Sequence, residues 1–404
     1  MRNNFWHYAR FFGPIPIGFG AAWMIMVGAE WAWSALLLLL LLPLVERLSG
    51  DDVADYEYEH PQIFVWMMYA FVVSIFLTFW VFIWSLAYAW RGIDLLGLSN
   101  LADVVLGIEM KSIHTGDNWA DFLLYTLLMS AVSGVGSVAT GHELSHRIHE
   151  PLSVFMSRAG GLLAFFTYYA IEHPYGHHEN VGTPVDSSTA LRGESIYRYA
   201  VRTSRQDYDT AWEIEAKRLQ TQGKQTWSWD NRLLRGYGAE LLVLLFVLIA
   251  TGPLAIWFLF SVLNTHFVYK IGTYGQHYGI VRVPGSAILM HHSWDCANRF
   301  TYWVSDGIGR HSHHHLEPEK EFWNLPYYAE APQYRYGYLT SMLICLIPPL
   351  WHRMLAPRLI EWDQHLASPE EQNLAYHANI ESGVPLLMAY GARSYLLKQG
   401  ADAS

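Results

Sequence analysis

Histidines at short, regular spacings are the residues of this chain that could do chemistry. The first pair, His142 and His146, is four positions apart, so both rings leave one face of a helix a turn apart. With Glu143 they form His-Glu-x-x-His, a pattern familiar from zinc enzymes. Two further groups follow, and the three groups together hold eight histidines with the spacing of metal ligands: His142, His146, His173, His177, His178, His311, His314 and His315.

Eight ligands are more than one metal ion accepts. A catalytic zinc ion uses about three protein ligands and keeps one position open, so eight histidines indicate two metal ions. Thirteen of the 20 histidines lie within residues 142–178 and 277–315, a segregation that scattered structural histidines would not show. The spacing does not assign each histidine to one metal or the other.

Four apolar stretches predict membrane helices that lead to these groups. Of the 404 residues, 52% are hydrophobic and 15% charged, which indicates membrane residence. The first stretch is too long for one helix and predicts a hairpin turning near Gly28 and Glu30. The last is interrupted at Gly252-Pro253, which predicts one kinked span or two short helices. The four stretches cover residues 11–45, 63–90, 122–141 and 241–265.

We therefore predict an all-α integral membrane protein with about six transmembrane helices and a cytosolic histidine-rich catalytic region. Between His142 and Arg235 there are 11 Lys or Arg, and such basic segments stay in the cytoplasm. The expected location is a bacterial inner membrane with the histidines on the cytoplasmic side. The predicted parts are transmembrane helices in 1–141, a cytosolic segment with the first two groups in 142–236, transmembrane helices in 237–271 and a cytosolic segment with the third group in 272–404.

The segment between the first two groups is expected to end on the side where it begins. Residues 152–171 are apolar, but their ends must share one side to bring His146 and His173 together. A helix that lies in the interface, or dips and returns, meets this requirement. Pro174 and Gly176 favour a loop for the second histidine group.

Charge and cysteine content limit the partners. The net charge of −10 gives no reason to expect nucleic-acid binding. The two cysteines, Cys296 and Cys345, are too few for an iron–sulfur centre, which needs about four. A separate protein must therefore deliver any electrons. Arg198, Arg202 and Arg205 offer a docking surface for an acidic carrier, although positive-inside topology explains the same residues equally well.

The histidine groups, with Gln276-His277-Tyr278-Gly279 between the second and third, resemble the membrane-bound non-haem di-iron oxygenases, which include fatty-acid desaturases, alkane hydroxylases and xylene monooxygenases. His-Glu-Leu-Ser-His-Arg at 142–147 and Arg-His-Ser-x-His-His at 310–315 look most like the alkane/xylene monooxygenase branch. The resemblance implies two iron ions, O2 as co-substrate, and His277 as a ninth ligand. The implied ligands are His142, His146, His173, His177, His178, His277, His311, His314 and His315.

Four other side chains are expected to support the ligands without binding metal. Glu143 and Asp186 are candidates to accept hydrogen bonds that fix histidine tautomers. Gln276 stands where alkane hydroxylases usually carry Glu, and His313 stands where the family usually has Asp or Asn, so His313 is not counted as a tenth ligand. Structural or hydrogen-bonding roles are expected for the remaining nearby histidines, His149, His291 and His292.

The resemblance implies a monooxygenase that hydroxylates the terminal methyl group of an alkane or alkyl-aromatic hydrocarbon to a primary alcohol. Its electrons would come from rubredoxin or from a ferredoxin-type reductase using NADH. A lipid desaturase is the main alternative. An intramembrane zinc protease with Glu143 as base would leave at least six clustered histidines unexplained. A metal transporter would place its ligands near the membrane midplane, whereas here they follow the apolar stretches.

Overall fold

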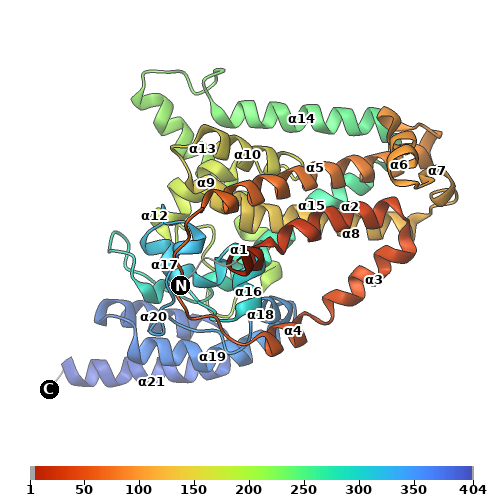
Figure 1. The fold of residues 1–404 in the computed structure, drawn as a ribbon. Coiled ribbons are helices and arrows are strands. Elements are labelled where there is room, and N and C mark those ends of the chain that lie inside the picture. The colour runs from red at the N-terminus through yellow and green to blue at the C-terminus, as the bar shows by residue number, and fades with distance from the viewer. Residues whose placement is uncertain (1–4, 403–404) are drawn as a thin grey trace.

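Long apolar helices form a bundle, and the histidine-bearing helices gather at one end of it (Figure 1). The computed structural model describes residues 5–402. Within this range the chain is helical, with two isolated β-bridges and no extended strand. The prediction of an all-α protein is therefore confirmed.

The first apolar stretch is a helical hairpin, as predicted. After the short helix α1 (Phe5–Ala9), helix α2 (Pro14–Met26) enters the bundle and α3 (Ala29–Leu39) leads back. Gly28 lies between them at φ +98°, a backbone conformation that glycine adopts without strain. Helix α4 (Leu42–Ser49) follows and packs beside the C-terminal half of the chain, where the Asp52 N–H donates to the Ala297 carbonyl (2.9 Å).

Helices α5 (Gln62–Arg91) and α8 (Trp119–Val135) form the centre of the bundle. Helix α2 lies against α5 so closely that a side chain at Gly18 would collide with Ser74. The connection between α5 and α8 lies at the end of the bundle away from the histidines (Figure 1) and contains α6 (Leu98–Leu106) and α7 (Met110–Ile113).

The fourth apolar stretch is two helices, α14 (Arg232–Thr251) and α15 (Ala255–Gln276), which run in opposite directions (Figure 1). The chain reverses at Gly252, whose φ is +55°. Within residues 5–402, two helical segments are long and apolar enough to cross a membrane, Gln62–Arg91 and Arg232–Gln276, the second of which contains this reversal. Shorter apolar helices are Pro14–Met26, Leu95–Leu106 and Trp119–Val135.

Past α8 the chain builds the histidine-bearing end. A π-helical turn, Gly136–Thr140, leads into α9 (Gly141–His146), followed by α10 (Pro151–Leu162) and α11 (Tyr169–Glu172). The prediction of a loop for the second histidine group is wrong: His173–His177 is a π-helical turn continued by α12 (His178–Asn180). Pro174 lies inside a continuous helical run from Tyr169 to Asn180, and the π-helical turn is a local change of helical pairing that accommodates its missing N–H.

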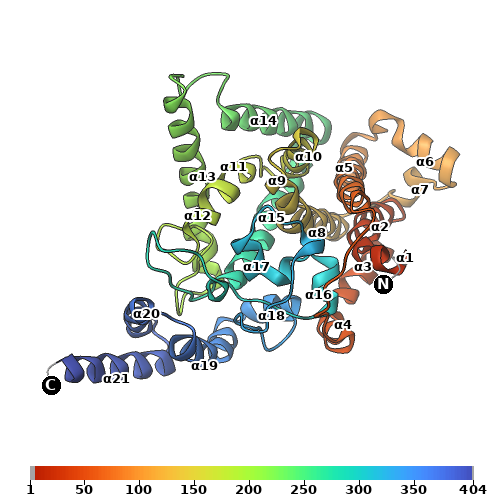
Figure 2. The same cartoon turned by 60° about the vertical axis from the view of Figure 1, so that its left-hand side comes forward.

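The C-terminal helices, residues 338–402, lie on the side of the histidine-bearing helices away from the bundle (Figure 2). Between residues 290 and 324 only short 3-10 turns and the helices α16 and α17 occur. The remaining α-helices are α13 (Ile196–Thr221), α16 (Arg299–Val304), α17 (His311–Leu316), α18 (Tyr338–Cys345), α19 (Pro348–His365), α20 (Pro369–Glu381) and α21 (Pro385–Asp402). The 3-10 turns of the described chain are Arg10–Phe12, Leu95–Gly97, Gly252–Leu254, Met290–His292, Ile308–Arg310 and Phe322–Asn324.

Candidate metal centre

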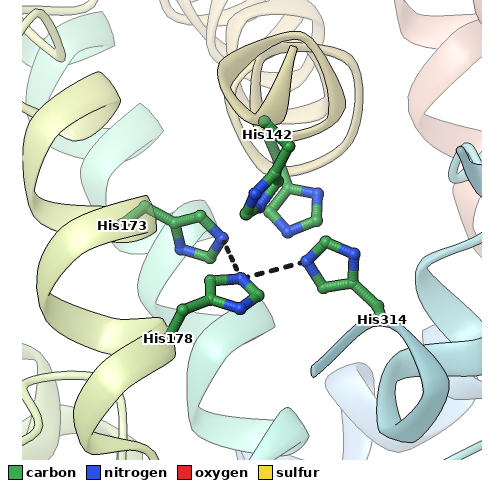
Figure 3. A group of neighbouring side chains, drawn as sticks. His142, His173, His178 and His314 are labelled. Atoms are coloured by element: carbon green, nitrogen blue, oxygen red, sulfur yellow. Dashed lines mark hydrogen bonds between the residues drawn. The ribbon is translucent and has the colours of Figure 1, made fainter. Parts of the chain in front are cut away.

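One cluster joins histidines from all three groups. Its rings converge from helices that are distant in the sequence, as Figure 3 shows for four of its members. The Nε2 atom of His178 lies 3.1 Å from that of His173 and 3.0 Å from that of His314. We call this group, whose ligand atoms all lie within 4.8 Å of one another, the five-histidine cluster: His142, His146, His173, His178 and His314.

A second cluster lies beside the first and includes the histidine between the second and third groups. The Nε2 atoms of His277, His311 and His315 form a triangle with sides of 3.1, 3.1 and 3.2 Å. The ring of His177 stands 4.9 Å from the His277 ring, measured between centroids. We call His177, His277, His311 and His315 the four-histidine cluster.

The spacing and protonation of these histidines fit bound metal ions. Two nitrogens bound at right angles to one metal at about 2.1 Å lie about 3.0 Å apart, close to the distances in both clusters. Burial lowers the pKa of His146 and His277 to about 3, so both rings are neutral and can ligate. The buried Nε2 atoms of His142 and His146 have no hydrogen-bond partner in the described chain, which a metal ion would supply.

Local helix geometry brings the ligands together. In α9 the four-residue separation sets His142 and His146 on one face, with ring centroids 5.0 Å apart. In α17 the same four-residue separation sets His311 and His315 on one face of the helix. Their Nε2 atoms are 3.1 Å apart. The predicted return of the chain between the first two groups also holds, because the His146 and His173 rings are 5.1 Å apart.

Two of the ligand rings are oriented by hydrogen bonds. Oδ1 of Asp186 lies 2.9 Å from Nδ1 of His177, a distance at which the carboxylate can accept a hydrogen bond from that nitrogen. Burial by itself would raise the pKa of Asp186, but the interaction with His177 lowers that pKa overall, so the carboxylate stays ionised. The backbone carbonyl of His292 accepts a hydrogen bond from Nδ1 of His277 (3.0 Å). These contacts leave Nε2 of both rings free to bind metal.

The other three supporting residues differ from one another. The amide of Gln276 lies 3.5 Å from Nδ1 of His311, and with its oxygen turned to the ring it would accept the Nδ1 proton. Glu143 accepts a hydrogen bond from the Phe322 N–H (3.3 Å), and burial raises the pKa of Glu143 to about 8. No hydrogen bond between Glu143 and a ligand histidine occurs in the described chain. His313 is buried but belongs to neither cluster.

The C-terminal helices carry residues that sequence reasoning missed. Arg192 forms a fully buried, two-pronged ion pair with Asp363 of α19 (2.7 and 2.8 Å). The Nε of Arg192 also donates to the carbonyl of Gly279 (2.8 Å), two residues after His277. Glu371 of α20 contacts His291 and His292. The sequence signals were the charges of these residues and, for Glu371, a helix-capping pattern that begins at Ser368, and neither identifies a partner.

Clustered histidines at the end of an apolar helix bundle indicate a membrane-associated metalloprotein, and comparisons with known proteins identify its family. The sequence model of the fatty acid desaturase family matches residues 117–343. The chain is 34% identical to the xylene/toluene monooxygenase hydroxylase component of Pseudomonas putida over 64% of its own length and 70% of that protein. The chain belongs to the fatty acid desaturase family, in the branch of the alkane and xylene monooxygenases.

Two alkane monooxygenases also resemble the chain. Identity is 30% to alkane 1-monooxygenase 1 of Pseudomonas aeruginosa, over 83% of this chain and 86% of that protein. Identity is 33% to the alkane 1-monooxygenase of Acinetobacter baylyi, over 60% of this chain and 61% of that protein. The matched region therefore spans less than two thirds of the Acinetobacter enzyme and most of the Pseudomonas aeruginosa enzyme.

Proposed function

We propose that the two clusters hold two iron ions and that the chain hydroxylates the terminal methyl group of a hydrocarbon. The observation that carries this proposal is the pair of buried histidine clusters at one end of an apolar bundle. In the balanced reaction R–CH3, O2, two electrons and two protons give R–CH2OH and H2O. Iron, which imidazole ligands suit, would supply the redox chemistry that dioxygen cleavage requires. The chain's histidines would hold the ions, with Asp186 and the His292 carbonyl orienting two of the rings.

Six crossings of the bacterial inner membrane account for the helix directions. Helices α2, α5 and α14 would lead away from the histidines, and α3, α8 and α15 would lead back. The proposal is supported by the position of residues 46–52, which contact residues 297–301 beside the clusters after the first pair of crossings. The 11 Lys or Arg between residues 142 and 235 favour a cytoplasmic location for this end. The division of the chain into the membrane parts 1–141 and 237–271 and the cytosolic parts 142–236 and 272–404 is likewise a proposal.

Electrons would reach this end from a soluble protein, either rubredoxin or a ferredoxin-type reductase using NADH. Arg198 and Arg205 are exposed on α13, whereas Arg202 is held by Glu194 (2.8 Å) and is less available to a partner. If the exposed pair docks an acidic carrier, raising the salt concentration should slow carrier-dependent turnover, because screening weakens such contacts. Turnover that does not respond to salt would contradict docking by charge.

The substrate would be apolar and would enter from the bilayer. A slender molecule that enters end-on between helices presents its least hindered carbon first, which favours a primary alcohol. A void of about 10 Å³ between α2 and α5, bordered by Met68, Phe71 and Thr140, has room for about one water molecule and is not itself a substrate tunnel. Thr140 stands two residues before His142. The relatives' names cover both alkanes and xylene or toluene, so both substrate shapes belong in the test.

A lipid desaturase is the second candidate, because the matching family model carries that name. A zinc protease is disfavoured by the surroundings of His142 and His146, since three further histidines complete their cluster and leave no open position of the usual kind. A transporter is disfavoured because the clusters lie at the end of the bundle.

Metal analysis and a substrate competition test the proposal together. Protein from iron-replete cells should contain two iron ions per chain. Reconstituted enzyme given n-octane, p-xylene and an acyl lipid in one reaction, with O2 uptake recorded and products separated by gas chromatography, should form primary alcohol. An alkene product from the lipid would identify a desaturase. One zinc ion without iron would refute the monooxygenase, and secondary alcohols or ring hydroxylation would refute end-on entry.

A further inference from the structure

A third group of potential ligands, His291, His292 and Glu371, lies outside the two clusters, with its ligand atoms within 4.8 Å of one another. Its hydrogen bonds argue against a third metal ion. Nδ1 of His292 accepts the Leu289 N–H (3.0 Å), so in the neutral ring the proton sits on Nε2. That Nε2–H donates to Oε1 of Glu371 (2.7 Å). A protonated nitrogen cannot bind a metal, so this group is a hydrogen-bonded triad.

The triad is fixed to the C-terminal helices. Glu371 belongs to the capping box of α20, in which its Oε2 accepts the Ser368 N–H (2.9 Å). The same Oε2 lies 3.1 Å from Nε2 of His291. From α19, the indole N–H of Trp362 donates to the His291 carbonyl (2.7 Å). Residues 291 and 292 are therefore held through both their side chains and their backbone.

The triad also reaches the four-histidine cluster. The carbonyl of His292 is the acceptor for Nδ1–H of His277, and the Ser293 hydroxyl lies 3.3 Å from the same nitrogen. A neutral imidazole has one ring proton, so placing it on Nδ1 leaves a lone pair on Nε2. That lone pair faces the Nε2 atoms of His311 and His315. The position of the His292 carbonyl therefore determines which tautomer His277 adopts and where its lone pair points.

We propose that Glu371 is a positioning residue for the four-histidine cluster: its carboxylate holds His291 and His292, and the His292 carbonyl in turn orients His277 for metal binding. The inference rests on the proposed two-iron centre. Under this proposal, helices α19 and α20, which contain no metal ligand, hold the four-histidine cluster in place. They do not hold the five-histidine cluster. Outer contacts of this kind typically change metal affinity by about 10- to 100-fold.

The test compares Glu371→Gln with Glu370→Gln. The amide introduced by Glu371→Gln would keep one acceptor oxygen, but its N–H2 would face the N–H of one histidine, so one of the two holding contacts is lost. Glu370 is the matched control, because it is the neighbouring acidic residue in the first turn of α20 and is exposed. Iron per chain is measured after equilibration at graded free Fe2+, and Mössbauer spectra are recorded on protein enriched in 57Fe.

We expect wild type and Glu370→Gln to hold two irons with two spectral components. Glu371→Gln should bind one iron about 10- to 100-fold more weakly and lose or shift one component only. Glu371→Asp, which keeps both acceptor oxygens on a shorter stem, should recover part of that affinity. General unfolding would affect both components, so circular dichroism is recorded alongside.

Two results would overturn the inference: an unchanged iron affinity and spectrum in Glu371→Gln, or an equal loss of both components. Wild-type protein that binds no iron pair would instead refute the proposed function. Trp362→Phe provides a second variant, since it removes the indole N–H that holds the His291 carbonyl, together with part of a buried ring. It should shift the same spectral component, and a shift of the other component would count against the proposal.

Discussion

His177 and His178 are consecutive in the chain but point into different histidine clusters. Their ring centroids are 5.6 Å apart and the ring planes are inclined by 74°. His177 stands 4.9 Å from the ring of His277, whereas Nε2 of His178 lies 3.0 Å from that of His314. His177 ends a π-helical turn and His178 begins α12, and consecutive helical residues point in different directions, so one short segment connects both proposed metal sites.

Removing these neighbours one at a time should empty different sites. His177→Ala takes a ligand from the four-histidine cluster and His178→Ala one from the five-histidine cluster, so each variant should lose about one of two irons, and hydroxylation should fall to background. Mössbauer spectra of the two 57Fe-enriched variants should show complementary remaining components. If both variants lost the same component, the division of ligands between clusters would be wrong.

His313 provides a test within the third histidine group. It is buried, and its ring lies 5.2 Å from that of Tyr328, away from both clusters. His313→Asn should therefore keep both irons and most of the activity. His314→Asn, at the next position, removes the ligand beside His178 and should abolish turnover with loss of iron. The check is iron content and alcohol formation in the two variants. Inactive His313→Asn with reduced iron would make His313 a ligand.

The spacing of residues in the sequence predicted those features of the structure that depend on local helix geometry. The facing pair His142 and His146 follows from the sequence, and the chain reversal at Gly252 is one of the two arrangements, a kinked span or two short helices, that Gly252-Pro253 predicted. The division between His177 and His178 could not be predicted, because Pro174 and Gly176 favoured a loop where the structure has a continuous helical segment. In α-helical geometry, consecutive residues diverge by about 100°, but that rule does not identify the partner of each ring.

Contacts between segments that are distant in the chain also could not be predicted from the sequence. Arg192 and Asp363 are separated by 171 positions, and Glu371 by 80 from His291. Nothing in a single sequence pairs one charged residue with another at such separations. The direct ligands were predictable because they occur in short recurring motifs, whereas the residues that hold them in place depend on how the C-terminal helices pack.

The Arg192–Asp363 pair should contribute strongly to stability. Both side chains are fully buried, so Asp363→Asn would leave the guanidinium without its counter-charge, a change that typically costs about 3–5 kcal/mol. Glu361→Gln on the same helix is the control, because Glu361 and its partner Arg358 are largely exposed and such pairs contribute about 0–1 kcal/mol. Thermal unfolding in detergent should show a clearly lower Tm for Asp363→Asn only. Equal Tm values would exclude a stabilising role for the pair.

Asp306 should make stability depend on pH. Burial raises its pKa from 3.8 to about 6, partly offset by the hydrogen bond that the Thr140 hydroxyl donates (2.7 Å). The folded protein thus holds this proton more tightly than the unfolded chain. Stability from Asp306 is therefore greatest below about pH 4, falls as the pH rises towards about 6, and is lost above that. The difference between the two pKa values corresponds to at most about 3 kcal/mol.

Asp306→Asn removes this titration while keeping an oxygen that can accept from Thr140. The backbone at Asp306 has φ +46°, a conformation that Asn tolerates well. We expect the variant to have a higher Tm than wild type at pH 7.5, by an amount that shrinks towards pH 4.5. Comparing the two proteins at each pH cancels the titration of shared groups that do not interact with Asp306; Glu143, whose pKa the Asp306 charge helps to raise, is the exception. A Tm difference that stays constant between pH 4.5 and 7.5 would show that the Asp306 carboxyl does not titrate in this range.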